Sequence, residues 1–341
     1  MGRFFAQKGR DRAHYNKGVD VITSADRWQG WPHVLSGKQF DRCFLERELF
    51  PLAGEMNNAA QTRDCDFLKG KRVRLLFYEP SERTLDSFVS ACDLLGAKSV
   101  WLGDPAIFSS QAKGESFADM IRVVNRYEYD AIVIRSKEVG GAAKAAEVSQ
   151  IPIVNAGDGS GEHPTQALLD AFTIHRSLGQ IDGVRIALVG DLVYSRTIRS
   201  LAFLLAQWKV GHILFVGPVN WKIGDDVRGH LEEKGVSYSE GYDLEEVAPQ
   251  VDVVYLTRAQ TERGNLPLRY TDVPGQKVCV TLTQAVLEKM PDHARVLHPL
   301  PRNDQFRELP EEFTDNPKVI IFDQVRNGLL IRMALLRMLL E

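Results

Sequence analysis

Short hydrophobic runs rich in valine, isoleucine and leucine alternate with amphipathic stretches along most of the chain. In the first half, runs of strand length occupy residues 72–79, 98–103, 131–135 and 151–157. Runs that stay hydrophobic without alternation are typical of strands buried on both faces of a parallel sheet. The stretches between them are predicted to be helices, so the pattern predicts a β-α-β series.

A second series of the same kind follows in the other half of the chain. Its predicted strands are residues 184–191, 212–218, 251–258, 277–282 and 295–300. The segment 163–179 is predicted to be a helix that joins the two series. The predicted fold class is therefore α/β, with two doubly wound parallel-sheet domains joined by inter-domain helices.

Length and composition are those of a soluble protein with two domains. The chain has 341 residues, more than one typical core holds, and its net charge of −3 gives no reason to expect nucleic acid. No hydrophobic run is long enough to span a bilayer, and the N-terminus lacks the apolar core of a secretory signal. The four cysteines form no CxxC pair, which favours a reduced, cytoplasmic protein without a disulfide framework.

The segment EPSERTLDSF, residues 79–88, follows the first predicted strand. Pro80 ends the strand and Ser81 can cap the next helix, whose first N–H groups would then point at one spot. Arg83 and the hydroxyl of Thr84 can add charge-assisted hydrogen bonds to an anion at that spot. The pattern favours a phosphate site, although the same residues would also suit a capped helix with surface charge.

Further polar residues stand at the ends of predicted elements, which is where open α/β sheets bind their ligands. They are Lys113, Arg135, His163, Gln166, Arg196, Arg258 and Gln260. Any one of them alone could be a surface residue or part of a plain helix start. So many cationic groups in a chain of negative net charge together predict a cleft between the domains that binds more than one anionic group.

Motifs for other kinds of catalysis are missing from the sequence. There is no GxxxxGK[ST] loop for a magnesium nucleotide, and VGDLVYS lacks the glycines of a dinucleotide site. No Ser-His-Asp set, cysteine nucleophile or metal-ligand cluster is indicated. We therefore expect a reaction that needs no cofactor and no metal.

Several of these segments resemble motifs of the aspartate and ornithine carbamoyltransferases. FYEPSERT is similar to the family's carbamoyl-phosphate loop, HPTQALLDAFTI to its carbamoyl-binding segment, and KGES to its mobile lysine loop. TRAQTER and HPLPR are similar to the aspartate branch of the family. The resemblance runs from residue 33 to the C-terminus.

The resemblance implies a division of the chain and an activity. It implies an N-terminal extension (1–32), a carbamoyl-phosphate-binding domain (33–162), an aspartate-binding domain (163–325) and a last helix (326–341) that packs back on the first domain. The implied enzyme transfers the carbamoyl group of carbamoyl phosphate to the α-amine of L-aspartate, in de novo pyrimidine biosynthesis. A homotrimer with shared active sites is also implied, and a regulatory or pathway partner stays open.

The positions that match the family's motifs carry over its site residues. The phosphate would be held by Ser81, Arg83 and Thr84, and the carbonyl oxygen would be polarised by Thr84, Arg135 and His163. The resemblance implies that Gln166 and the backbone of Leu300 hold the carbamoyl NH2 group. It implies that the two carboxylates of aspartate are bound by Arg196, Arg258 and Gln260. Ser109 and Lys113 would reach into the cleft of a neighbouring subunit.

Glu82 and Leu85 depart from the family pattern. The family has threonine at the first position and a second arginine at the other, so this loop has lost a cation and gained a carboxylate. At an effective dielectric constant of about 20, like charges about 5 Å apart repel by roughly 3 kcal/mol. A carboxylate beside a site for a dianion therefore needs an explanation.

Three explanations of this departure are open. Glu82 points to solvent or pairs with Lys113 or Arg83, and the enzyme stays active. Alternatively, Glu82 contacts the amine of a different acceptor, or the chain is a non-catalytic structural or regulatory paralogue. The many polar residues retained at strand ends favour a carbamoyltransferase, with aspartate as the expected acceptor.

Overall fold

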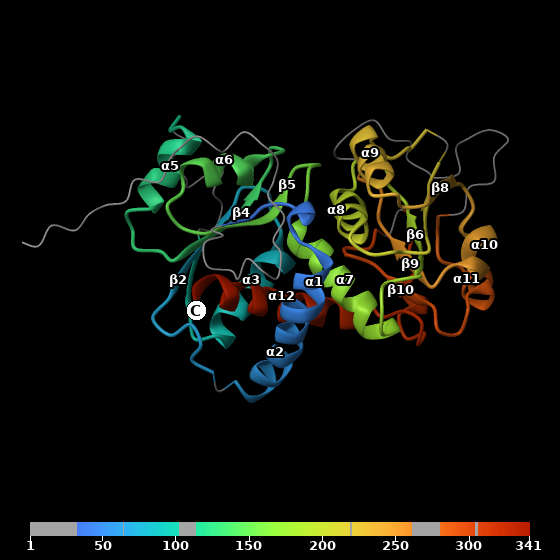
Figure 1. The fold of residues 1–341 in the computed structure, drawn as a ribbon, viewed down its shortest axis with the longest axis horizontal. Coiled ribbons are helices and arrows are strands. Elements are labelled where there is room, and N and C mark those ends of the chain that lie inside the picture. The colour runs from blue at the N-terminus through green and yellow to red at the C-terminus, as the bar shows by residue number, and fades with distance from the viewer. Residues whose placement is uncertain (1–32, 64, 102–113, 219, 261–279, 304–305) are drawn as a thin grey trace, which may run out of the picture.

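The chain folds into two lobes, each built on a five-stranded sheet whose strands all run parallel (Figure 1). The computed structural model describes residues 33–63, 65–101, 114–218, 220–260, 280–303 and 306–341. The predicted N-terminal extension, Ser109 and Lys113 lie outside the described residues. In the described part of the chain, no helix is long and apolar enough to cross a bilayer.

The first sheet has the strand order β1-β5-β4-β2-β3. Its strands are β1 (His33–Val34), β2 (Arg72–Phe77), β3 (Lys98–Trp101), β4 (Ala131–Ser136) and β5 (Ile153–Asp158). β2 pairs with β3 on one side and with β4 on the other. The strand that follows β2 in the chain is therefore added on one side of it, and the later strands β4 and β5 are added on the opposite side. Such a switch point leaves a crevice at the carboxyl ends of the two central strands.

The second sheet repeats this arrangement with the order β10-β9-β6-β7-β8. Its strands are β6 (Arg185–Val189), β7 (His212–Val216), β8 (Tyr238–Gly241), β9 (Val253–Leu256) and β10 (Arg295–Leu297). Here the switch point lies between β6 and β9, which pair side by side. Both sheets therefore place the ends of two central strands where a ligand can bind.

Helices cover the sheets and connect the strands. In the first lobe they are α1 (Arg42–Phe44), a π-helical stretch (Leu45–Leu49), α2 (Phe50–Thr62), α3 (Glu82–Leu94), α5 (Phe117–Val124) and α6 (Gly141–Val148). α7 (Pro164–Leu178) leads to the second lobe, whose helices are α8 (Arg196–Leu205), α9 (Asp225–Glu233), α10 (Leu244–Val247) and α11 (Gln284–Lys289), before the last helix, α12 (Ile321–Leu340). Short 3-10 turns lie at Gly37–Gln39, Ala248–Gln250 and Glu311–Phe313.

The predicted α/β class and parallel sheets are confirmed, with a few differences in the strands. All predicted strands except one are found, most of them two to four residues shorter than predicted, whereas β4 is one residue longer and β5 ends one residue later. Residues 102 and 103 of the predicted strand 98–103 lie outside the described residues. The prediction at 277–282 is wrong for 280–282, which form no strand, and 277–279 lie outside the described residues. The edge strands β1 and β8 were not predicted, because one has two residues and the other, YSEG, has no hydrophobic run.

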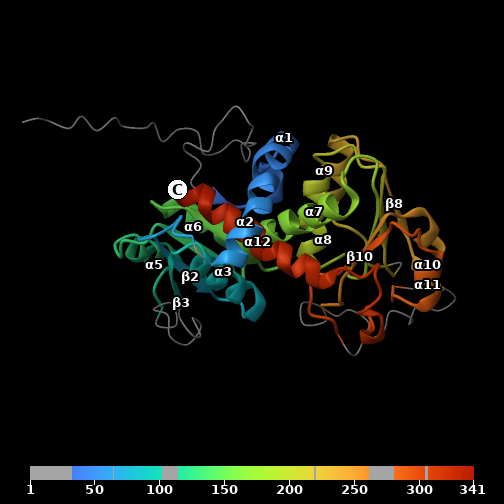
Figure 2. The same ribbon diagram turned by 90° about the horizontal axis from the view of Figure 1, so that it is seen from below.

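The helices α7 and α12 connect the two lobes through a shared hydrophobic core. One cluster of buried side chains contains Val133 of the first sheet, Ile186 of the second sheet, Phe172 of α7 and Leu335 of α12. α12 packs against α2, α3 and α7, and Figure 2 shows it running along the first lobe towards the second. The two lobes are thus joined by one continuous hydrophobic core.

His33 begins β1 and attaches it to β5. It pairs in register with Ile153, and its Nδ1 accepts a hydrogen bond of 3.1 Å from the Ile153 amide. The side chain is buried, and burial lowers the pKa of the imidazole to about 4. The folded protein therefore holds His33 in its neutral form near neutral pH.

We expect His33 to reduce the stability of the protein as the pH falls from 6.5 to about 4. In that range the unfolded chain binds a proton at His33 and the folded chain does not, which corresponds to about 3 kcal/mol over the whole range. Urea unfolding of the wild type and of His33→Gln, across this pH range, measures the effect. Glutamine keeps an acceptor for the Ile153 amide but does not titrate, so equal pH slopes for the two proteins would contradict the prediction.

Candidate active site

A cavity of about 890 Å³ lies between the lobes, at the carboxyl ends of strands from both sheets. It is lined by the loop after β2, the end of β4, the starts of α7 and α8, the loops after β9 and β10, and α12. Of the predicted site residues, those that line it are Ser81, Glu82, Arg83, Thr84, Arg135, His163, Gln166, Arg196, Arg258, Gln260 and Leu300. The predicted cleft between the domains is present, and it is strongly cationic.

The loop after β2 begins α3 at the edge of the cavity. Ser81 occupies the N-cap position, but its side chain makes no capping bond, which corrects the expectation from the sequence. Its Oγ donates instead to Thr84 Oγ1 over 3.0 Å. The positive end of the helix dipole is therefore accompanied here by two linked hydroxyl groups, which suits an anionic oxygen.

Arg83 and Arg258 bring positive charge to this spot from the two different lobes. Burial lowers the pKa of the Arg83 guanidinium, Glu82 opposes that shift, and the positive charge of Arg258 adds to it. The guanidinium stays charged near neutral pH because an arginine pKa starts above 12. The two guanidinium groups repel each other, and an anion bound between them would offset this repulsion.

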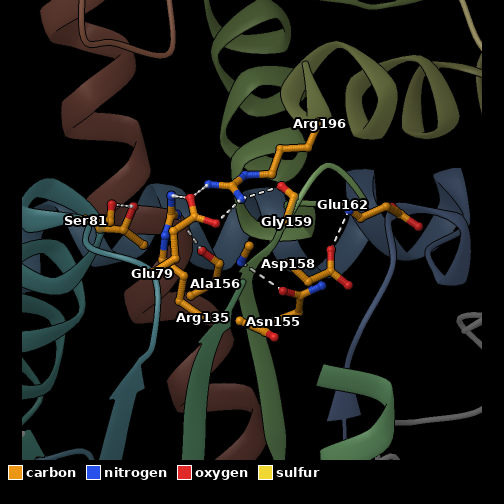
Figure 3. A network of polar contacts seen from close by, with 12 residues as sticks. Glu79, Ser81, Arg135, Asn155, Ala156, Asp158, Gly159, Glu162 and Arg196 are labelled. Carbon is orange, nitrogen blue, oxygen red and sulfur yellow. Dashed lines mark hydrogen bonds and ion pairs between the residues drawn. The ribbon is translucent and has the colours of Figure 1, made fainter. Parts of the chain in front are cut away.

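Glu79 links the two lobes through Arg135 and Arg196 (Figure 3). Its Oε1 accepts hydrogen bonds from Arg135 Nη2 over 2.8 Å and from Arg196 Nη2 over 2.9 Å, and its Oε2 accepts one from Arg196 Nη1 over 3.1 Å. Arg135 is the penultimate residue of β4 in the first lobe, and Arg196 begins α8 in the second. A single carboxylate therefore holds both guanidinium groups at the base of the cavity.

Backbone carbonyl groups of the β5–α7 region complete this arrangement. Arg135 Nη1 donates to the oxygen of Ala156 over 2.9 Å, and Arg196 Nη1 donates to that of Gly159 over 2.7 Å. Gly157 lies between them with φ +115°, and a Cβ atom there would lie 3.0 Å from Arg135 Nη1. Only glycine fits this position, because the backbone adopts a positive φ and the guanidinium groups approach it closely.

His163 stands just before α7 and presents a neutral imidazole. It is buried, its amide donates to Ser200 Oγ over 2.8 Å, and its Nδ1 lies 3.4 Å from Thr165 Oγ1. Burial lowers the pKa of His163 well below its ordinary value, and the positive charges of Arg135, Arg196 and Arg332 lower it further. A neutral histidine beside arginines can donate one N–H without adding another charge.

Two further predicted residues are positioned by a buried aspartate at the end of β6. Asp191 Oδ2 accepts a hydrogen bond of 3.0 Å from the amide of Gln260, and its Oδ1 accepts two more from Val193 and Tyr194. The loop after β9, which carries Arg258 and Gln260, is thereby tied to the loop after β6 that leads to Arg196. These are the residues for which an interaction with carboxylates is predicted.

Two family models match the chain and together cover almost all of the described lobes. The carbamoyl-P binding domain of aspartate/ornithine carbamoyltransferase matches residues 33–176, and the Asp/Orn binding domain matches residues 182–339. The chain belongs to the aspartate/ornithine carbamoyltransferase family. The family model therefore extends to all of the elements that line the cavity.

Known members of the family include enzymes named for aspartate. Aspartate carbamoyltransferase 2 of Pisum sativum, a chloroplastic protein, is 42% identical over 100% of this chain and 86% of its own length. The catalytic subunit of Methanothrix thermoacetophila is 43% identical over 91% of this chain and 98% of its own. Aspartate transcarbamoylase of Trypanosoma cruzi, in complex with N-(phosphonacetyl)-L-aspartic acid, is 35% identical, with a TM-score of 0.82 over 91% of this chain and 96% of that one.

The two departures from the family pattern have different environments. Glu82 is exposed, lines the cavity and forms no hydrogen bond or ion pair within the described residues. Leu85 is half-buried and packs against the hydrophobic core, and it is not among the residues that line the cavity. Glu82 can therefore act directly on a ligand, whereas Leu85 cannot.

Some residues of the cavity were not predicted from the sequence. Glu79 belongs to the segment EPSERTLDSF, but its arginine partners are far away in the chain. Arg332 is buried on α12, donates to Ser87 Oγ over 2.8 Å and lies over the ring of Phe88, and burial lowers its pKa to about 10. Its place in the apolar run LLIRMALL of the last helix was the signal that could have identified it.

No group of three or more His, Cys, Asp or Glu side chains that could hold a metal ion occurs within the described residues. The polar groups that line the cavity are mainly cations, hydroxyls and amides, together with the carboxylates of Glu79 and Glu82. This set suits anion binding and the stabilisation of negative charge that develops during a reaction.

Proposed function

We propose that this protein transfers the carbamoyl group from carbamoyl phosphate to the α-amine of L-aspartate, giving N-carbamoyl-L-aspartate and phosphate, a step of de novo pyrimidine biosynthesis. The observation that carries the proposal is the single cavity that cationic groups line from both lobes. The phosphate leaving group carries two negative charges, and aspartate carries two carboxylates. Each of them needs a set of cations, and the two sets have to lie close together. Solved relatives in complex with carbamoyl phosphate and aspartate support the same substrates.

Carbamoyl phosphate would bind at the first lobe. Ser81, Arg83 and Thr84 would hold the phosphate at the start of α3, and Arg135 and His163 would face the carbonyl oxygen together with Thr84. That oxygen gains negative charge when the amine attacks the carbamoyl carbon. Donors that are fixed beforehand stabilise this charge by about 3–4 kcal/mol each. The C–O bond to the phosphate then breaks, and the phosphate takes the proton that the amine loses.

Aspartate would bind at the second lobe. Arg196, Arg258 and Gln260 would receive its two carboxylates, with the amine directed at the carbamoyl carbon. Three N–H groups of Arg196 donate to Glu79 and Gly159 among the described residues, so two of its five N–H groups remain for a substrate. Glu79 therefore orients Arg196 without using all of its capacity to bind a carboxylate.

The assembly and the compartment belong to the proposal as well. A homotrimer in which Ser109 and Lys113 reach into the cleft of a neighbouring subunit follows from the family resemblance, and both residues lie outside the described part of the chain. A cytoplasmic location agrees with the scattered cysteines. Fractionation and light scattering of the full-length protein test these two points.

A ureido assay with purified protein, carbamoyl phosphate and L-aspartate tests the proposed reaction directly. Product that forms with aspartate as acceptor supports the proposal, and binding of N-(phosphonacetyl)-L-aspartate to the same cavity would show that both substrate sites are used together. The absence of ureido product at saturating substrates would reject the activity.

A different amine acceptor is the second candidate, and Glu82 is the observation that favours it. Its exposed carboxylate lines the cavity and would attract a cationic group on an acceptor. A panel of amines in the same assay separates the two candidates, because an acceptor with a second amine should then exceed aspartate in kcat/KM. If neither turnover nor phosphate binding is found, the chain is a non-catalytic paralogue.

We expect Glu82→Thr to increase the affinity for inorganic phosphate by about fivefold. The Glu82 carboxylate repels the phosphate dianion, and threonine removes this repulsion. The expected gain is moderate because Glu82 is exposed, so that water and salt screen its charge. Isothermal titration at low ionic strength measures the change. Asp86→Ser is the matched control, because Asp86 is exposed on the same helix and does not line the cavity. An equal gain for both variants would assign the effect to net charge alone.

A further inference from the structure

A buried aspartate on α7 lies directly behind the cavity. Asp170 is completely buried, and its carboxylate accepts three hydrogen bonds. Gln166 Nε2 donates to Oδ1 over 2.9 Å, Gln324 Nε2 donates to the same oxygen over 2.6 Å, and the hydroxyl of Tyr255 donates to Oδ2 over 2.7 Å. Buried polar groups linked in this way have their orientations fixed by one another.

The orientation of Gln324 follows from the backbone of the loop after β10. Gln324 Oε1 accepts a hydrogen bond of 2.9 Å from the amide of His298, so its NH2 group is the end that faces Asp170. Asp170 Oδ1 then receives donors from two amides. If Gln166 were turned over, its carbonyl oxygen would face the carboxylate oxygen, which is repulsive. The oxygen of Gln166 is therefore the end directed away from Asp170, and Gln166 lines the cavity.

The same network reaches the second group that is proposed to hold the carbamoyl NH2. The amide of Leu300 donates to His298 Nδ1 over 2.8 Å, so the proton of this imidazole is on Nε2, which lies 3.1 Å from Glu308 Oε1. His298 and Glu308 are both buried. The loop that carries the Leu300 carbonyl is thus attached to Gln324, and through Gln324 to Asp170.

We propose that Asp170 is a positioning residue for carbamoyl recognition: it holds the amide of Gln166 so that its oxygen faces the cavity, in register with the carbonyl of Leu300. This inference deepens the proposed function and rests on it. The NH2 group of carbamoyl phosphate would find two acceptor oxygens, one from α7 and one from the loop after β10, whereas a methyl group in its place would form no hydrogen bond with either. Asp170 would therefore contribute to the discrimination between a carbamoyl and an acetyl group without touching either.

The protonation of Asp170 does not alter this geometry. Burial raises the pKa of the carboxyl to about 7, and the three donors oppose that shift. Both amides donate to Oδ1, so a proton on Oδ2 would be directed to the oxygen of Tyr255 and would leave the two amide bonds in place. The same reasoning applies to asparagine at this position, which can present its oxygen to the amides and its NH2 to Tyr255.

The test compares the affinities for carbamoyl phosphate, acetyl phosphate and inorganic phosphate. Wild-type protein is first assayed for turnover of carbamoyl phosphate, since failure at this stage rejects the proposed function and not the role of Asp170. We then expect Asp170→Leu, in which the leucine side chain is similar in shape to that of aspartate, to lower the affinity for carbamoyl phosphate by about tenfold. Without Asp170 the oxygen of Gln166 is no longer held towards the cavity, and the site loses an acceptor for the NH2 group. The affinities for acetyl phosphate and inorganic phosphate should change by less than about twofold.

Two control variants separate positioning from a general structural role. Asp170→Asn and Tyr255→Phe both keep the acceptor for the two amides, so both should retain the preference for carbamoyl over acetyl phosphate. If Asp170→Leu does not fold, Asp170→Ala replaces it, since water can enter the space to satisfy the three donors. An equal loss for all three phosphate compounds in the leucine or alanine variant would overturn the proposal, as would loss of the preference in Asp170→Asn.

Discussion

Replacing Arg135 by alanine is expected to lower kcat by a factor of about 10²–10³. The guanidinium is buried at the end of β4 and is held by Glu79 and the carbonyl of Ala156 before any substrate binds. A donor that needs no reorientation stabilises the charge on the carbamoyl oxygen more than a mobile one does. The effect should fall mainly on kcat and much less on the KM for aspartate, because the charge exists only in the transition state.

The matched control for this substitution is Arg126→Ala. Arg126 is exposed in the same lobe and does not line the cavity, so its removal should leave kcat unchanged. Arg135→Lys keeps the charge but not the planar fork, and we expect an intermediate loss. Circular dichroism shows whether Arg135→Ala is folded. A folded variant with less than a threefold loss of kcat would show that Arg135 does not act on the carbonyl.

Replacing Glu79 by glutamine is expected to destabilise the protein by about 3 kcal/mol or more. Glu79 is the partner of Arg135 and Arg196, whose side chains are each 8% exposed, and its own side chain is 19% exposed. Removing one member of such a buried ion pair leaves uncompensated charge, which costs about 3–5 kcal/mol. For a chain of 341 residues this corresponds to a decrease in Tm of about 4 °C or more.

Inorganic phosphate should restore part of this stability. With the carboxylate gone, two cations face the cavity, and an anion that binds only the folded protein raises Tm by mass action. Thermal unfolding with and without phosphate measures the difference for the wild type, Glu79→Gln and Glu138→Gln. Glu138 forms an exposed ion pair with Lys144, so its removal should change Tm by less than about 1 °C. Equal behaviour of the two glutamine variants would contradict a special role for Glu79.

The strands were predictable from the sequence because both sheets are parallel and buried. All six residues of β4 are buried, and the first four, AIVI, form a continuous hydrophobic run that is easily recognised. The strand β8 could not be predicted in this way. It lies at the edge of the second sheet, where a strand pairs on one side only and polar residues are tolerated.

The residues at strand ends were also predictable, but their partners were not. Arg135 and Arg196 follow from the rule that ligands bind at the carboxyl ends of strands, and both line the cavity. Glu79 lies 56 residues from Arg135 and 117 from Arg196, and Asp170 lies 154 from Gln324. No local pattern indicates such pairs. The capping of α3 by Ser81 was predicted incorrectly, because the hydroxyl has a better partner in Thr84.

The position of α12 has a consequence for how the protein folds during synthesis. α12 is translated after all the strands of both sheets, yet its side chains belong to the same buried cluster as β2 and β4 of the first lobe. The first lobe therefore cannot complete its core when its own strands have been translated. Until α12 has been translated, the apolar surfaces of α2 and α3 that it covers stay exposed, and exposed surface of this kind favours aggregation of a nascent chain.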